Sequence, residues 1–229
     1  MSASVMPPPL ALTQYEAAAF DGLPLFEAAL ISRPLVEEAA AAAATLFRGA
    51  GLKDIAGIAM LHQHFHLAAG EVLLERKQGA DRVVVTPVPV AEAAAAGARP
   101  YMFKLAPRAG GGFRCVPLEF AAAELVDPAD LDALAAPAFI DALGALLEAS
   151  GGLNIVGVAL LRHRDHVAAV DGSTMELTDE LNRALTIMPQ SHVPAPRNGE
   201  ETITTRTVWT FGDRAGEDAC RHCTHCSHR

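Results

Sequence analysis

The sequence predicts an α+β protein in which two related lobes of helix and sheet form one domain and a Cys/His-rich tail follows. Three observations support this class. Stretches that begin at Ser or Pro and stop at Gly are typical of helices, and they alternate with short apolar runs typical of strands. A seven-residue apolar pattern recurs later in the chain. Three of the four cysteines lie in the last ten residues.

The first lobe is predicted over residues 13–126, after a loose Pro-rich N-terminus at 1–12. Thr13-Gln-Tyr-Glu16 is typical of a capping box that opens a short helix. A second helix is expected from Ser32-Arg-Pro34 to about Phe47, and a strand from Ile55 to Leu67. Further strands are expected at Val72–Leu74, Val83–Val90, Tyr101–Leu105 and Phe113–Val116, with a helical turn or loop at Ala91–Ala98.

The second lobe is predicted over residues 127–211. Asp127-Pro128 and Pro137 each open a helix, and Gly151-Gly152 ends the second one. A last strand is expected at Glu201–Phe211, before the polar tail of residues 212–229.

An internal repeat relates the two lobes. Ile55-Ala-Gly-Ile-Ala-Met-Leu61 aligns without gaps with Ile155-Val-Gly-Val-Ala-Leu-Leu161, at an offset of 100 residues. Each copy follows a helix that stops at glycine and leads into a His-bearing segment. We therefore expect an internal duplication in which the two apolar strands pair centrally, although common residues at this length also match by chance.

Composition and charge exclude several classes of protein. With 51% hydrophobic residues among 229, the chain can bury a substantial core, and with 20% charged residues it is not disordered throughout. A net charge of −9 argues against a nucleic-acid partner. The sequence shows neither a long apolar span nor a secretory signal, and its cysteines do not suit a disulfide framework, so we expect a cytoplasmic protein without a membrane partner.

Three histidines alternate along the predicted first-lobe strand: His62, His64 and His66. Residues two apart share one face of a strand, so the three imidazoles are predicted to form a row. With Glu71 as a carboxylate ligand, such a row suits zinc, iron, nickel or copper and gives a candidate catalytic site for a metal-dependent hydrolase or oxygenase. The alternative is a solvated polar face on an edge strand.

Part of this region resembles the first motif of the cupin family. Gly57, His64-x-His66, Glu71 and Gly79 follow that motif with slightly stretched spacing over about 25 residues. The resemblance implies a β-barrel that holds a metal with two His, a Glu and a later His. A long Ala-rich helix directly before the strand, and the lack of a second motif, depart from the cupin pattern.

A second cluster has the sequence Arg162-His-Arg-Asp-His166. Arg162 and Arg164 stand where His62 and His64 stand in the first copy, so their guanidinium groups are candidates for binding an anionic substrate or other small anionic ligand. The alternative is a charged strand end. Among the other acids, we interpret Glu119, Glu176 and Glu180 as surface charges.

The tail contains the strongest metal-binding signal, Cys220-Arg-His-Cys223-Thr-His-Cys226-Ser-His228. Cys-x2-Cys spacing lets two thiolates reach one ion from a tight turn. Cys220, Cys223 and Cys226 are the predicted ligands, and the fourth is a local histidine such as His228, or Cys115, or a histidine of the first cluster. Zinc is the expected ion, with iron or copper as alternatives; otherwise the tail is oxidation-prone and unstructured.

The function expected from these patterns is metal binding, with zinc preferred. In one interpretation the metal is structural, and the protein is a binding or interaction module with a protein partner. In the other, His62, His64, His66 and Glu71 hold a catalytic metal. A closed site of four ligands would favour the module, and a three-ligand site open to water would favour the enzyme.

Overall fold

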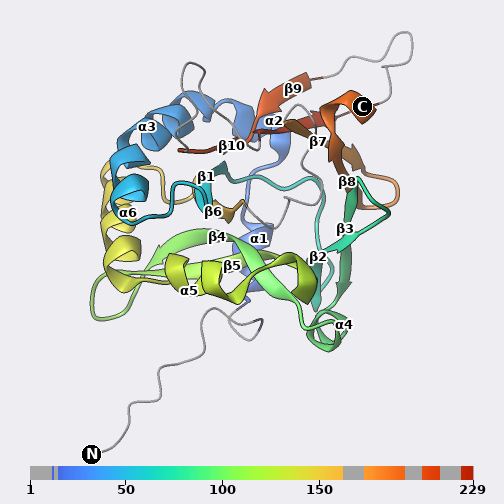
Figure 1. Ribbon diagram of the computed structural model, residues 1–229, viewed down its shortest axis with the longest axis horizontal. Coiled ribbons are helices and arrows are strands. Elements are labelled where there is room, and N and C mark those ends of the chain that lie inside the picture. The colour runs from blue at the N-terminus through green and yellow to red at the C-terminus, as the bar shows by residue number, and fades with distance from the viewer. Residues whose placement is uncertain (1–11, 13–14, 162–172, 194–202, 212–222, 229) are drawn as a thin grey trace, which may run out of the picture.

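The computed structural model describes residues 12, 15–161, 173–193, 203–211 and 223–228 (Figure 1). For residues 173, 203–204 and 223–228 it describes the backbone alone. Helices and a large curled mixed sheet make up this part, so the predicted α+β class is confirmed.

Within these ranges the strands form one sheet with the order β10-β1-β6-β4-β5-β2-β3-β8-β7-β11-β9. Its strands are β1 (Ala56–Met60), β2 (Glu71–Lys77), β3 (Val83–Pro89), β4 (Arg99–Pro107), β5 (Phe113–Ala121), β6 (Val156–Leu160), β7 (Ser173–Asp179), β8 (Ala184–Pro189), β9 (Ile203–Arg206), β10 (Val208–Trp209) and β11 (Cys223–His228). The first and last strands of this order, β10 and β9, are separated in the chain by Thr207 alone. The sheet therefore curls until its two outermost strands become neighbours along the chain.

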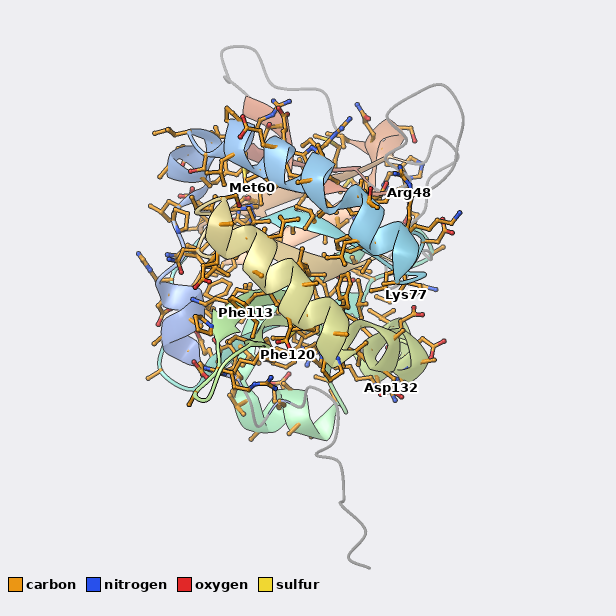
Figure 2. All side chains as sticks on the ribbon, turned by 90° about the vertical axis from the view of Figure 1, so that its left-hand side faces the viewer. Arg48, Met60, Lys77, Phe113, Phe120 and Asp132 are labelled. Atoms are coloured by element: carbon orange, nitrogen blue, oxygen red, sulfur yellow. The ribbon has the colours of Figure 1, made fainter. Side chains whose placement is uncertain are left out.

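Two long helices, α3 (Arg33–Gly49) and α6 (Pro137–Ala149), lie side by side across the sheet (Figure 2). Phe47 of α3 packs edge-on against Phe139 of α6, with ring centroids 5.1 Å apart. The shorter helices of the described part are α1 (Ala17–Asp21), α2 (Phe26–Leu30), α4 (Val90–Ala95), η2 (Ala123–Leu125), α5 (Pro128–Leu134) and η4 (Gln190–His192). No helix in the residues that the structure describes is long and apolar enough to cross a membrane.

The two strands of the sequence repeat are neighbours in the sheet. β1 and β6 are buried along their whole length and pair antiparallel, with Ile58 opposite Val158. These two residues are also counterparts in the repeat. The preceding helices end alike, since Gly51 and Gly151 both adopt φ of 73°, which favours glycine. The expectation of two buried apolar strands that pair is therefore confirmed.

Several predicted boundaries are wrong. β1 ends at Met60 and does not continue to Leu67; the Met60 amide donates to the carbonyl of Thr207, and the chain then leaves the sheet. The last strand, predicted over residues 201–211, is interrupted at Thr207, which separates β9 from β10. Glu16, expected inside the first turn of the first helix, is instead the N-cap residue of α1; Thr13 lies outside the described residues, so the bonds of the predicted capping box stay a prediction.

Candidate metal centre

Two of the three histidines expected in a row meet just beyond β1. The Nε2 atoms of His62 and His64 lie 3.1 Å apart, and their ring centroids are 4.7 Å apart. His66 is exposed. The predicted row on one strand face is wrong, because residues 61–67 do not continue the strand. The imidazoles of His62 and His64 are nevertheless in contact, because the chain bends at this point.

Gln63, between these two histidines, anchors the bend. Its side chain is 3% exposed, and its Nε2 atom donates to the carbonyls of Leu23 at 2.6 Å and Asp21 at 3.3 Å. Its backbone amide donates to the carbonyl of Pro24 at 2.8 Å. These bonds attach the His-bearing segment to the chain between α1 and α2. Gln63 was not predicted as a site residue, because its partners are carbonyls some 40 residues away.

Phe26 forms an apolar wall beside both imidazoles. Its ring is fully buried, and its centroid lies 5.3 Å from that of His62 and 6.0 Å from that of His64. The His64 ring is nearly parallel to it, at an interplanar angle of 19°. Apolar packing of this kind limits access of water and strengthens electrostatic interactions between the polar atoms.

Strand β7 supplies two polar partners to His64. The Oγ1 atom of Thr178 lies 2.8 Å from His64 Nδ1, and the Oε1 atom of Glu176 lies 3.2 Å from His64 Nε2. Residues two apart share a strand face, which explains why both reach the same ring. His64 and Glu176 are each only 8% exposed. The interpretation of Glu176 as a surface charge is therefore wrong.

The hydrogen bonds of His62 and His64 indicate which of their ring nitrogens can bind a cation. His62 Nδ1 lies 2.9 Å from the carbonyl of Met60, and a carbonyl only accepts, so this nitrogen carries the proton. When His62 is neutral, it presents the lone pair of Nε2 toward His64. The Nε2 atom of His64 thus faces two acceptors, His62 Nε2 and a carboxylate oxygen of Glu176. The space between these three atoms therefore favours a cation, either a proton or a metal ion.

Glu71, the carboxylate predicted to join the histidines, is bound by an arginine instead. Arg183 donates to both of its carboxylate oxygens, at 2.6 and 3.3 Å, and also to the carbonyl of His66 at 2.7 Å. The amide of Ala68 adds a bond of 2.7 Å. The hydrogen bond from Arg183 holds the pKa of the Glu71 carboxyl below its ordinary value. Glu71 thus secures the loop after His66.

The end of the predicted metal-binding tail forms a strand of the sheet. β11 pairs in parallel with β7 and antiparallel with β9. Its register places Cys226 opposite Glu176 and Cys223 opposite Ser173. Cys220 lies outside the described residues, so its predicted role in metal binding stays a prediction.

Two other predicted candidates are Cys115 and the cluster that contains Arg162 and Arg164. Cys115 is buried on β5, and burial raises the pKa of its thiol to about 12, as expected for a cysteine that serves as a small apolar side chain. Arg162, Arg164 and the rest of their cluster lie outside the described ranges.

The described side chains do not by themselves include a group of three or more His, Cys, Asp or Glu residues that could hold a metal ion. No family model, curated protein or solved structure matches the chain.

Proposed function

We propose that this protein binds a transition-metal ion, with zinc preferred, through the Nε2 atoms of His62 and His64. One observation carries the proposal: His64 Nε2 lies 3.1 Å from His62 Nε2 and 3.2 Å from Glu176 Oε1, at a nearly buried position. Nitrogen ligands about 2.0–2.1 Å from a tetrahedral zinc ion are themselves about 3.3 Å apart. The imidazole pair therefore needs little rearrangement to accept the ion.

Glu176 has the role of a negative group beside the ion. Burying a divalent cation requires nearby negative charge, because the surrounding protein is a poorer solvent than water. In the absence of metal, the same carboxylate can accept the proton that His64 carries on Nε2. Thr178, at the other nitrogen of His64, fixes the ring orientation, as hydrogen-bond partners of metal-binding histidines commonly do.

The enclosure of the centre supports a structural or binding module over a metalloenzyme. Phe26 is fully buried, and His64 and Glu176 are each 8% exposed, which leaves little room for a substrate at the ion. The metalloenzyme interpretation needs His62, His64, His66 and Glu71 around one ion. The placement of two of them does not favour this, because His66 is exposed and Glu71 forms a salt bridge with Arg183.

We further propose that the two lobes arose by internal duplication. Support comes from matched bonds around the β1–β6 pair. The amide of Leu61 donates to the carbonyl of Ile155, and the amide of Leu161 donates to the carbonyl of Ile55, both at 2.8 Å. In the repeat, Leu61 corresponds to Leu161 and Ile55 to Ile155. The two hydrogen bonds are therefore equivalent, as a local two-fold relation requires.

The test of metal binding is the zinc content of reduced full-length protein before and after dialysis against zinc. We expect about one ion per chain, lost in His64→Ala. His66→Ala is the matched control, since it removes the same side chain from an exposed position two residues away. Circular dichroism checks that each variant is folded. Equal zinc in the parent and in folded His64→Ala, or no zinc in the parent, would contradict the proposal.

A further inference from the structure

Strand β11 places one cysteine of the tail in register with Glu176, the carboxylate beside the histidine pair. In the parallel pairing with β7, Cys226 is the register partner of Glu176, whose carboxylate lies 3.2 Å from His64 Nε2. In the antiparallel pairing with β9, Cys226 is the register partner of Thr205. Thr205 is 5% exposed, and its Oγ1 accepts a bond of 3.1 Å from Arg33. The position of Cys226 is therefore flanked by two buried residues.

We infer that Cys226 supplies a thiolate to the ion held by His62 and His64, so that the tail and the histidine pair form a single metal centre. This inference rests on the proposed function. The described side chains do not by themselves provide a complete set of metal ligands. Strand β11 places Cys226, a residue type that can bind metal, in register with Glu176. No second knuckle of cysteines is then required.

The register distinguishes Cys226 from Cys223. Register partners occupy the same face of a sheet, and positions along a strand alternate between faces. Cys223 is three positions from Cys226 on extended backbone and pairs with Ser173. Its position therefore belongs to the face opposite that of Glu176. A Cys-x2-Cys knuckle needs a tight turn between its cysteines, whereas residues 223–228 form a strand.

The resulting ligand set determines the class of metal. Two neutral imidazoles and one thiolate favour zinc, iron or copper over magnesium and calcium, which prefer oxygen ligands. When the metal–sulfur bond forms, the proton of the Cys226 thiol passes to solvent, and no oxidation or reduction occurs. The thiolate and the Glu176 carboxylate together balance the charge of a divalent ion.

Titration of the reduced full-length chain with Co²⁺ tests this inference, because a thiolate ligand adds a sulfur-to-cobalt charge-transfer band that histidine ligands lack. We expect the band in the parent protein, its loss in Cys226→Ser, and an affinity for Co²⁺ at least about tenfold lower in that variant. Cys220→Ser and Cys223→Ser are the matched controls and should keep both band and affinity. Cys226→His, which exchanges one metal ligand for another, should restore binding without the band.

The outcomes separate the inference from the function on which it rests. Cobalt bound by the parent without a charge-transfer band would overturn the inference and leave the histidine pair as the site. A band that survives in Cys226→Ser, or that disappears equally in Cys223→Ser, would also overturn it. A parent that binds no cobalt would refute both proposals.

Discussion

Gly57 and Gly157 are counterparts in the sequence repeat. Replacing either of them with alanine should lower the free energy of unfolding, because the added methyl group has no space at the centre of the sheet. A Cβ on Gly57 would lie 2.4 Å from the carbonyl oxygen of Trp209 on β10. A Cβ on Gly157 would lie 2.5 Å from the carbonyl oxygen of Phe103 on β4, and 2.4 Å from Cδ2 of Leu61. Separations below 3.0 Å are essentially never seen for real Cβ atoms, and the backbone of a paired strand cannot turn aside as a side chain can.

The size of the effect follows from two opposing terms. Replacing Gly with Ala reduces the entropy of the unfolded chain and by itself stabilises by about 0.4–1 kcal/mol. Forcing an extra carbon into a packed core costs about 1–3 kcal/mol, and loss of a ladder hydrogen bond adds about 1 kcal/mol. Gly57→Ala and Gly157→Ala should therefore each destabilise by about 2 kcal/mol, which lowers the Tm of a chain this long by about 4–8 °C.

Urea and thermal unfolding, followed by circular dichroism, measure this effect. Gly49→Ala is the control, because Gly49 ends α3 and a Cβ there would meet nothing within 4 Å. It should stabilise the protein by up to about 1 kcal/mol. If Gly57→Ala or Gly157→Ala is as stable as the parent, the close packing of strands around β1 and β6 is wrong.

Three further predictions follow from single contacts. Gly144→Ala, although in a helix, should lower the free energy of unfolding measured in urea by about 1–3 kcal/mol, because the added Cβ would lie 2.1 Å from the ring of Phe113. Glu71→Gln should destabilise at pH 7, and the loss should shrink as the pH falls below about 4.3. The hydrogen bond from Arg183 lowers the folded-state pKa of this carboxyl, so its contribution to stability is present above the unfolded pKa and disappears as the pH falls through the folded value. In a chain whose three tail cysteines are serines, Cys115 should react with thiol reagents at pH 8 only after unfolding, since burial raises its pKa to about 12; rapid labelling of the native protein would refute this.

Local signals in the sequence were sufficient for most of the helices and strands. Asp127 is the N-cap of α5, and its carboxylate accepts a hydrogen bond from the amide of Ala129 at 2.9 Å. Proline in the first turn marks the starts of α3 and α6. These signals work because caps and turns depend on a few consecutive residues. The end of β1 at Met60 was mispredicted because pairing with β10 stops there, and pairing is not local.

The centre was predictable only in part. The spacing of His62 and His64 identified the imidazole pair, but Glu71 was chosen as its carboxylate because it is near in sequence. Glu176, more than 100 positions away, is the acid that reaches His64. One signal for it was available: Thr174, Glu176 and Thr178 alternate with apolar residues, as on a strand with one polar face.

The sequence by itself determined where the two long helices begin and end, that two apolar strands would be buried, and that His62 and His64 would form a pair. These properties depend on backbone preferences and burial within short segments. Only the tertiary structure decided that β1 and β6 pair antiparallel with Ile58 opposite Val158, that Glu176 lies beside His64, and that β11 places Cys226 in register with Glu176. The physical reason is that strand pairing joins residues distant in the chain, and a shift of one position in register would move every residue of the strand to the other face.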